Sequence, residues 1–218
     1  LGTSSTMVVC ILQVFAEWLG LALGEYDIAD LAYKIEREDL NMLGGKQDQY
    51  AASFGGFNYI EFNKTNVLVN PLRIKSKIIR ELEQSIVLFH TGKSRESALI
   101  IAEQIKSSFD PNAVPTKALH KIKETAIELK KTLLLGDIEM FAKLIGNSWV
   151  QKKMLSNIIS NPELDQVYNA VMNAGGLGGK ISGAGGGGFF MFFVIPERRP
   201  EIIRTLASFN GEVIPRSE

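Results

Sequence analysis

The sequence is poor in cysteine and has no excess charge of either sign. Its 218 residues contain one cysteine, Cys10, and 24 basic residues against 24 acidic ones. A single cysteine excludes an internal disulfide and favours a reducing cytoplasm, and its apolar neighbours predict a buried thiol. A net charge of zero argues against wholesale binding to nucleic acid or to a membrane surface. The length suits one large domain or two small ones.

Long hydrophobic runs are also missing. The longest apolar stretch, residues 7–24, is interrupted by Gln13 and Glu17 and is short for a bilayer span. We therefore expect a buried core helix there, and no secretion signal. The chain begins "LGTSST" without an initiating methionine, so we expect it to lack an N-terminal portion.

The pattern of apolar residues predicts an α+β fold with strands near both ends and a helical middle. After the first helix, a second begins with Asp27 as its N-cap, and paired glycines then break the pattern between residues 42 and 56. We expect strands over 57–62, 66–70, 85–89, 180–182, 189–195 and 212–215. We expect further helices over 94–108, 116–135, 137–146, 148–158, 162–173 and 200–209. A domain boundary is predicted at 82/83.

A second glycine-rich stretch, "SGAGGGG" at 182–188, lies directly before the apolar run "FFMFFVI". A flexible linker would have polar flanks, whereas both ends of this stretch join predicted strands. Glycine lets backbone amides approach a ligand closely and permits positive φ angles, which favours an anion cradle. A tight turn or close backbone packing is the alternative.

The start of the chain offers a second possible anion site. Thr3, Ser4 and Ser5 stand where the first helix begins, so the unpaired N–H groups of its first turn and the helix dipole would attract a phosphate. The hydroxyl groups could add donors or a metal ligand. Simple N-capping by a serine or threonine explains the same residues.

Acidic residues gather between residues 36 and 48. Glu36, Glu38 and Asp39 fall within one helical turn, and Lys46 and Asp48 follow in a glycine-flanked loop. Carboxylates near a phosphate cradle can hold Mg²⁺, and Asp48 could accept or orient a hydroxyl proton. A solvated charged helix face is the alternative, and it is favoured for Glu38 and Asp39.

One more loop, "HTGKSRES" from residue 90, follows a predicted strand and enters a helix. Its hydroxyl and basic groups form a third possible anion site, suited to a phosphorylated or hydroxyl-rich substrate. Basic residues at the start of a helix are also common on ordinary surfaces.

These four elements, in this order, resemble the GHMP kinase superfamily, named for galactokinase, homoserine kinase, mevalonate kinase and phosphomevalonate kinase. "LGTSST" is similar to the end of its phosphate motif P-x-x-x-G-L-G-S-S-A-A, and "KISGAGGGGFF" to its third motif. The resemblance covers essentially the whole chain but only the later two-thirds of a family member. It implies an incomplete S5-like ATP-binding domain over 1–82 and a ferredoxin-like domain with extra helices over 83–218.

The resemblance also implies the roles of individual residues. ATP and Mg²⁺ are the expected cofactors, with Ser4 and Glu36 as metal ligands, Glu38 as the competing carboxylate, and Asp48 and Lys46 as catalytic residues. The expected nucleotide-phosphate residues are Gly2, Thr3, Ser4, Ser5, Gly183, Ala184, Gly185 and Gly186. The expected substrate-binding residues are Gln47, Thr91, Gly92, Arg95 and Lys180.

Within the superfamily, "GKQDQYAA" and "HTGKSR" most resemble bacterial sugar kinases that phosphorylate the anomeric hydroxyl of D-glycero-D-manno-heptose 7-phosphate. The implied product is the 1,7-bisphosphate, a precursor of nucleotide-activated heptose and surface polysaccharide. A kinase for another sugar, such as fucose or galactose, and a non-catalytic fragment of the same fold are the alternatives.

Overall fold

The computed structural model describes residues 3–92, 97–107, 110 and 113–215, and it divides the chain into two compact units. Unit 1 comprises Leu1–Arg73 and unit 2 comprises Ile74–Glu218. Both helices and sheets are present, which confirms the predicted α+β class. The predicted boundary between the functional domains at 82/83 stays a prediction; the compact units separate nine residues earlier, between Arg73 and Ile74.

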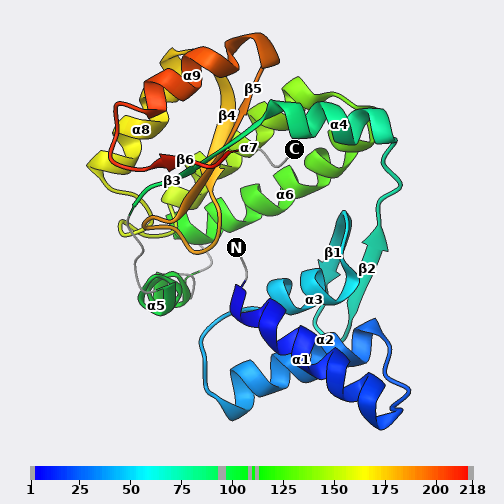
Figure 1. The fold of residues 1–218 in the computed structure, drawn as a ribbon. Coiled ribbons are helices and arrows are strands. Elements are labelled where there is room, and N and C mark those ends of the chain that lie inside the picture. The colour runs from blue at the N-terminus through cyan, green and yellow to red at the C-terminus, as the bar shows by residue number, and fades with distance from the viewer. Residues whose placement is uncertain (1–2, 93–96, 108–109, 111–112, 216–218) are drawn as a thin grey trace. The chain divides into compact units, whose positions relative to one another are not determined.

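Unit 1 contains three α-helices, one π-helical turn and one hairpin (Figure 1). The helices are α1 (Thr3–Leu19), α2 (Glu25–Lys34) and α3 (Gln47–Phe54), and the π-helix covers Ile35–Asp39. Strands β1 (Asn58–Phe62) and β2 (Val67–Pro71) pair antiparallel, as the alternating sequence predicts. Helices α2 and α3 pack on each other and on α1, around the buried side chains of Val9, Ile28, Ala32 and Tyr50.

The start of α2 differs from its prediction. Gly24, not Asp27, is the N-cap residue. Asp27 occupies the third helical position, where its Oδ2 accepts a hydrogen bond of 2.9 Å from the N–H of Gly24. An acidic side chain at this position satisfies a donor that the helix itself leaves unpaired, so the same residue serves the helix start from inside.

Helix α1 forms as predicted, but its expected burial is wrong. Only Ser5, Val9 and Ala16 are buried in it. Its exposed large side chains are Met7, Ile11, Val14, Phe15, Trp18 and Leu19. Cys10 is also exposed, because the contacts of α1 with α2 and α3 cover one face of the helix. No helix in the described part of the chain is long and apolar enough to cross a membrane.

Unit 2 is built on a four-stranded antiparallel sheet in the order β4-β5-β3-β6. The strands are β3 (Ile86–His90), β4 (Gly176–Ile181), β5 (Phe189–Val194) and β6 (Glu212–Val213). Helices follow β3, and α9 (Arg199–Leu206) connects β5 to β6, so the chain runs strand–helix–strand–strand–helix–strand. This connectivity confirms the predicted ferredoxin-like architecture with additional helices.

The described part of unit 2 contains five more α-helices (Figure 1). They are α4 (Ser76–Ser85), α5 (Ser97–Ser107), α6 (Val114–Leu135), α7 (Ile138–Lys153) and α8 (Pro162–Asn173), and a 3₁₀ turn covers Pro196–Arg198. Helix α7 packs against α6 and β4, and α8 packs against α9 and β4. The core between them contains Trp149, Phe190 and Phe192, all fully buried.

Glycine explains the two largest differences from the predicted elements of unit 2. The predicted helices 137–146 and 148–158 are one helix, α7, which passes through Gly146 and ends at Lys153. A Cβ on Gly146 would lie 3.3 Å from the Cα of Gly178, and one on Gly178 would lie 2.0 Å from the carbonyl oxygen of Ala142. These glycines let the helix and β4 touch along their backbones, so β4 begins at Gly176, before the predicted start at Lys180.

Candidate functional site

Unit 1 contains a buried polar cluster that joins the start of α1 to the π-helical turn. The hydroxyl of Ser5 donates a hydrogen bond of 2.8 Å to Oε2 of Glu36, and Nε2 of Gln49 donates to the same oxygen. Ser5 and Glu36 are 1% exposed and Gln49 is fully buried. The π turn carries Glu36 inward, while Glu38 and Asp39 on the same turn are exposed to solvent. Single π turns often occur at functional sites.

The second carboxylate oxygen of Glu36 has a different environment. Within the described part of the chain, Oε1 is buried and has no hydrogen-bond partner. An unpartnered buried carboxylate oxygen is costly, and a hard cation such as Mg²⁺ would satisfy it. No group of three or more His, Cys, Asp or Glu side chains gathers among the described residues. Proteins usually hold Mg²⁺ through one or two carboxylates together with substrate phosphates and waters.

The first turn of α1 presents its other hydroxyl groups outward. Thr3 and Ser4 are exposed, whereas Ser5 faces Glu36. The expected role of Ser4 as a metal ligand and of Thr3 and Ser5 at the nucleotide phosphates stays a prediction. Gly2 lies outside the described residues. The sequence predicted Ser5 only as a phosphate-binding residue. The structure adds that its hydroxyl fixes the carboxylate of Glu36.

Lys46, Gln47 and Asp48 stand at the beginning of α3. Asp48 lies exposed in the first turn, where the helix dipole favours a carboxylate. Lys46 turns toward α2: its Nζ lies 3.8 Å from Oδ1 of Asp30 and 4.4 Å from the ring centre of Tyr33. The structure thus places the two predicted catalytic side chains near the same helix start, with Lys46 engaged by Asp30.

A cleft of about 580 Å³ opens beside this helix start. Asp30, Lys46, Gln47 and Tyr50 line one side, and the hairpin turn 63–66 lines another. The preceding loop is held by the guanidinium of Arg37, which donates hydrogen bonds of 3.3 Å to the carbonyl oxygens of Leu43 and Gly45. Unit 1 therefore has a cleft beside the start of α3, which Lys46 and Gln47 help to line, whereas Asp48 is not among its lining residues.

Unit 2 contains the glycine loop, 182–188, between β4 and β5. Its residues Gly183, Gly185, Gly186, Gly187 and Gly188 all have positive φ angles, between 73° and 145°. A Cβ on Gly185 would meet the carbonyl oxygen of Ile159 at 2.9 Å, so this position requires glycine. The structure confirms that glycine is needed there for backbone conformation and close approach.

Hydrogen bonds donated by backbone amides of Ser182, Gly186 and Gly188 fix the shape of the loop. The N–H of Ser182 donates to the carbonyl of Phe189 (2.8 Å), and that of Gly186 donates to the carbonyl of Ile159 (2.8 Å). The N–H of Gly188 donates to the hydroxyl of Thr91 (3.0 Å). In the described part of the chain, the N–H groups of Gly183, Ala184, Gly185 and Gly187 have no hydrogen-bond partner. An anion would find donors in this stretch, as the cradle interpretation expects.

Thr91, at the end of β3, anchors this loop. Its hydroxyl accepts the hydrogen bond from the N–H of Gly188. Its own N–H donates to the carbonyl oxygen of Gly188 at 2.8 Å. Gly92 is exposed with φ of 69°, and Arg95 lies outside the described residues. The expected contacts of Thr91, Gly92 and Arg95 with substrate stay predictions.

Two lysines adjoin the loop, and sequence reasoning identified only one of them as functional. Lys180, a predicted substrate-binding residue, is at the end of β4. Lys152, in the last turn of α7, donates a hydrogen bond from Nζ to the carbonyl oxygen of Gly183. Burial, with a smaller contribution from Lys180, lowers the pKa of Lys152 to about 8. In the sequence, Lys152 followed a core tryptophan and resembled an ordinary surface lysine.

Comparison with known families identifies the family of this fold. The family described as GHMP kinases N terminal domain matches residues 1–56, and GHMP kinases C terminal matches residues 122–211. The chain belongs to the GHMP kinase family.

Individual relatives are more specific. The chain is 49% identical, over 98% of its length, to D-glycero-alpha-D-manno-heptose 7-phosphate kinase of Campylobacter jejuni, and it spans 62% of that relative. The crystal structure of a D-glycero-D-manno-heptose 1-phosphate kinase from Bacteroides thetaiotaomicron is 45% identical with a TM-score of 0.74, covering 99% of this chain and 59% of that one. An L-fucokinase/L-fucose-1-P guanylyltransferase of Bacteroides fragilis is 28% identical over 97% of this chain and 22% of its own length.

Proposed function

We propose that the protein is an ATP-dependent sugar kinase acting on D-glycero-D-manno-heptose 7-phosphate. It would transfer the γ-phosphate of ATP to the anomeric hydroxyl and form the 1,7-bisphosphate. The observation that carries this proposal is 49% identity along nearly the whole chain to a heptose 7-phosphate kinase. Because the chain spans less than two thirds of that relative, the activity belongs to the complete protein.

We propose that the candidate sites supply the functions that phosphoryl transfer requires. The transition state is loose, so catalysis depends on in-line positioning and on dispersing negative charge. In our proposal the carboxylate of Asp48 orients the acceptor hydroxyl and receives its proton, while Gln47 and the cleft beside it hold the sugar. We further propose that Lys46, whose Nζ lies 3.8 Å from Oδ1 of Asp30, balances charge near the acceptor.

The nucleotide phosphates would be held by backbone donors. We propose that the first turn of α1, from Thr3 to Ser5, and the loop residues Gly183–Gly186 contact them. Glu36 Oε1 and the Ser4 hydroxyl would hold Mg²⁺, which would supply positive charge to offset that of the phosphates. We place the reaction in the cytoplasm, a reducing compartment compatible with one exposed free cysteine.

The test is ADP release by the complete protein with Mg²⁺, ATP and a panel of acceptors. The panel contains heptose 7-phosphate, the unphosphorylated heptose, L-fucose and galactose. We expect the highest kcat/KM with heptose 7-phosphate. A higher value with fucose would favour the activity of the fucokinase relative, and no ADP release with any acceptor would indicate a non-catalytic protein of this fold.

A further inference from the structure

The chain brings two lysines to the glycine loop of unit 2 from different elements. Lys152 comes from the last turn of α7 and Lys180 from the last residues of β4. Nζ of Lys152 donates to the carbonyl oxygen of Gly183, three residues after Lys180. The two ammonium groups are near enough that Lys180 disfavours the charge on Lys152.

Among the residues that the structure describes, neither lysine has a carboxylate partner. In the described part of the chain, no Asp or Glu oxygen lies within 4.0 Å of Nζ of Lys152 or Lys180. Both side chains are partly buried, and desolvation lowers the pKa of each ammonium. Two adjacent, partly buried cations without a counter-ion are unfavourable for folding, which suggests that a ligand provides the missing charge.

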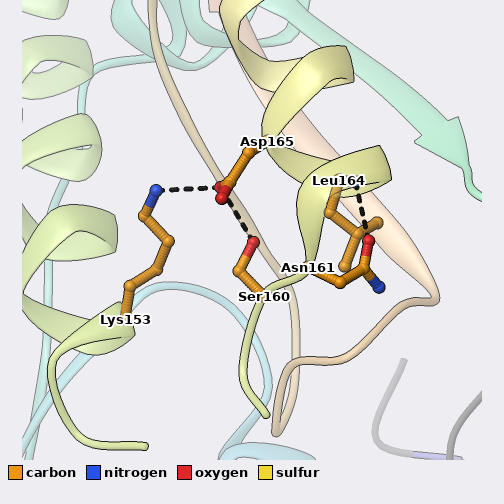
Figure 2. Close-up of polar contacts among 5 residues, drawn as sticks. All are labelled: Lys153, Ser160, Asn161, Leu164 and Asp165. Atoms are coloured by element: carbon orange, nitrogen blue, oxygen red, sulfur yellow. Dashed lines mark hydrogen bonds and ion pairs between the residues drawn. The ribbon is translucent and has the colours of Figure 1, made fainter. Parts of the chain in front are cut away.

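The next residue along α7 shows what a structural lysine looks like in the same place. Nζ of Lys153 lies 2.9 Å from Oδ1 of Asp165, which also accepts a hydrogen bond of 2.9 Å from Ser160 (Figure 2). Asn161 caps the same end of α8 by accepting from the N–H of Leu164. Lys153 thus neutralises a carboxylate and joins two helices, whereas Lys152 has no carboxylate partner in the described part of the chain.

Backbone donors lie next to the lysine pair. The N–H groups of Gly183, Ala184, Gly185 and Gly187 lack partners within the described residues, while Gly186 and Gly188 anchor the loop. A phosphate monoester at neutral pH carries nearly two negative charges and three acceptor oxygens, so it matches two ammonium groups and a run of amides.

We infer that Lys152 and Lys180, with the backbone amides of Gly183, Ala184, Gly185 and Gly187, bind a terminal phosphate group of a substrate. Lys152 is then a substrate-binding residue that favours substrates carrying this phosphate. The inference rests on the proposed kinase function. Two substrates carry such a group: the sugar acceptor, through its 7-phosphate, and ATP, through its γ-phosphate.

The experiment compares Lys152→Met and Lys180→Met with the matched control Lys153→Met in the complete protein. Steady-state kinetics give KM for heptose 7-phosphate and for ATP separately. If the bound phosphate is the 7-phosphate of the acceptor, KM for heptose 7-phosphate should rise about tenfold or more in both variants, with KM for ATP unchanged. A source in the nucleotide predicts the reverse. Lys153→Met should alter neither value.

A binding arm makes the test independent of turnover. Isothermal titration with inorganic phosphate, at constant ionic strength set with chloride, should show binding to the wild-type protein and at least tenfold weaker binding to Lys152→Met. Lys152→Arg, which keeps the charge, should retain binding. If both KM values and phosphate binding are unchanged in Lys152→Met and Lys180→Met, the inference is wrong.

The two arms also separate this inference from the proposed function. A wild-type protein that binds phosphate through the two lysines but does not phosphorylate heptose 7-phosphate refutes the proposed acceptor and leaves the phosphate site standing. A wild-type protein that phosphorylates heptose 7-phosphate with no change in the lysine variants refutes the phosphate site alone.

Discussion

The two units differ in the charge that their own side chains leave uncompensated. Unit 1 buries the carboxylate of Glu36 with one oxygen unpartnered, whereas unit 2 holds Lys152 and Lys180 without a carboxylate within the described residues. A divalent cation would satisfy the first and a phosphate group the second. The uncompensated charge of unit 1 is therefore opposite to that of Mg²⁺, and the uncompensated charge of unit 2 is opposite to that of a phosphate group.

The means also differ. In unit 1, side chains do the work: Ser5 and Gln49 occupy one oxygen of Glu36 and so fix the other. In unit 2, the backbone provides most of the possible ligand contacts, because a loop with positive φ at five glycines leaves several amides unpaired among the described residues. Substitutions should consequently act through charge in unit 1 and through both charge and backbone strain in unit 2.

The largest expected effect comes from Asp48 in unit 1. Asp48→Ala removes the proposed proton acceptor from an exposed helix start, so we expect turnover to fall by about 10²–10⁴-fold with little change in ATP affinity. Steady-state kinetics with ATP titration measure both quantities. Asp48→Asn is the control for shape, and unchanged turnover in either variant would remove Asp48 from the mechanism.

The glycine loop should show the largest effect on stability. Gly185→Ala places a Cβ 2.9 Å from the carbonyl oxygen of Ile159 at φ of 119°, so we expect a loss of about 3 kcal/mol in the free energy of unfolding. Gly183→Ala has φ of 85° but meets nothing within 4 Å, so about 1 kcal/mol is expected. Urea unfolding compares them, and equal losses would contradict the close approach.

Neighbouring lysines of α7 should respond in opposite directions. Lys152 has a pKa of about 8, below its ordinary 10.5, so its ammonium destabilises the folded state at pH 7. Lys152→Met should raise the free energy of unfolding by about 1–2 kcal/mol, after loss of the hydrogen bond to Gly183. Lys153→Met should lower it by about 0.5 kcal/mol, since it breaks the partly exposed ion pair with Asp165.

The pH dependence follows from the same shift. Between pH 8 and 10.5 the folded wild-type protein has lost the proton of Lys152 while the unfolded chain retains it, so stability at this site rises with pH. The advantage of Lys152→Met over wild type should therefore shrink toward pH 10. Thermal unfolding at pH 7 and pH 10 tests this, and a constant advantage would mean that Lys152 is not the group responsible.

A further expected effect concerns the metal. Glu36→Gln retains an oxygen that can accept from Ser5 and Gln49, so the fold should persist, but it removes the carboxylate charge. We expect the Mg²⁺ concentration for half-maximal turnover to rise about tenfold. Glu38→Gln, on the exposed side of the same turn, is the matched control. An equal shift in Glu38→Gln would favour the competing carboxylate.

Sequence patterns predicted the hairpin of unit 1 and helix 162–173 because alternation, Asn161 and Pro162 are local signals. They could not predict α3, because its glycine-flanked sequence carries a weak helical signal and its burial comes from packing on α2. They failed for the start of β4 for a related reason: Gly178 belongs to a strand only because α7 needs close contact there.

The candidate site shows the same division. The glycine loop and the acidic segment were visible as motifs, but burial separates Glu36 from Glu38 and no local pattern reports burial of one carboxylate among several. The predicted burial of Cys10 was also wrong, because its apolar neighbours on α1 are themselves exposed. Lys152 was missed because two adjacent lysines look alike in the sequence. Only the structure shows that Lys153 pairs with Asp165 and Lys152 does not.

Phosphorus NMR of the product tests the central claim most directly. The complete protein is incubated with heptose 7-phosphate, ATP and Mg²⁺, and the phosphorus signals are followed with coupling to the sugar protons. We predict a new signal coupled to the anomeric proton, beside the retained 7-phosphate and in step with ADP. A new phosphate on another carbon, or ATP that stays intact, would contradict the account.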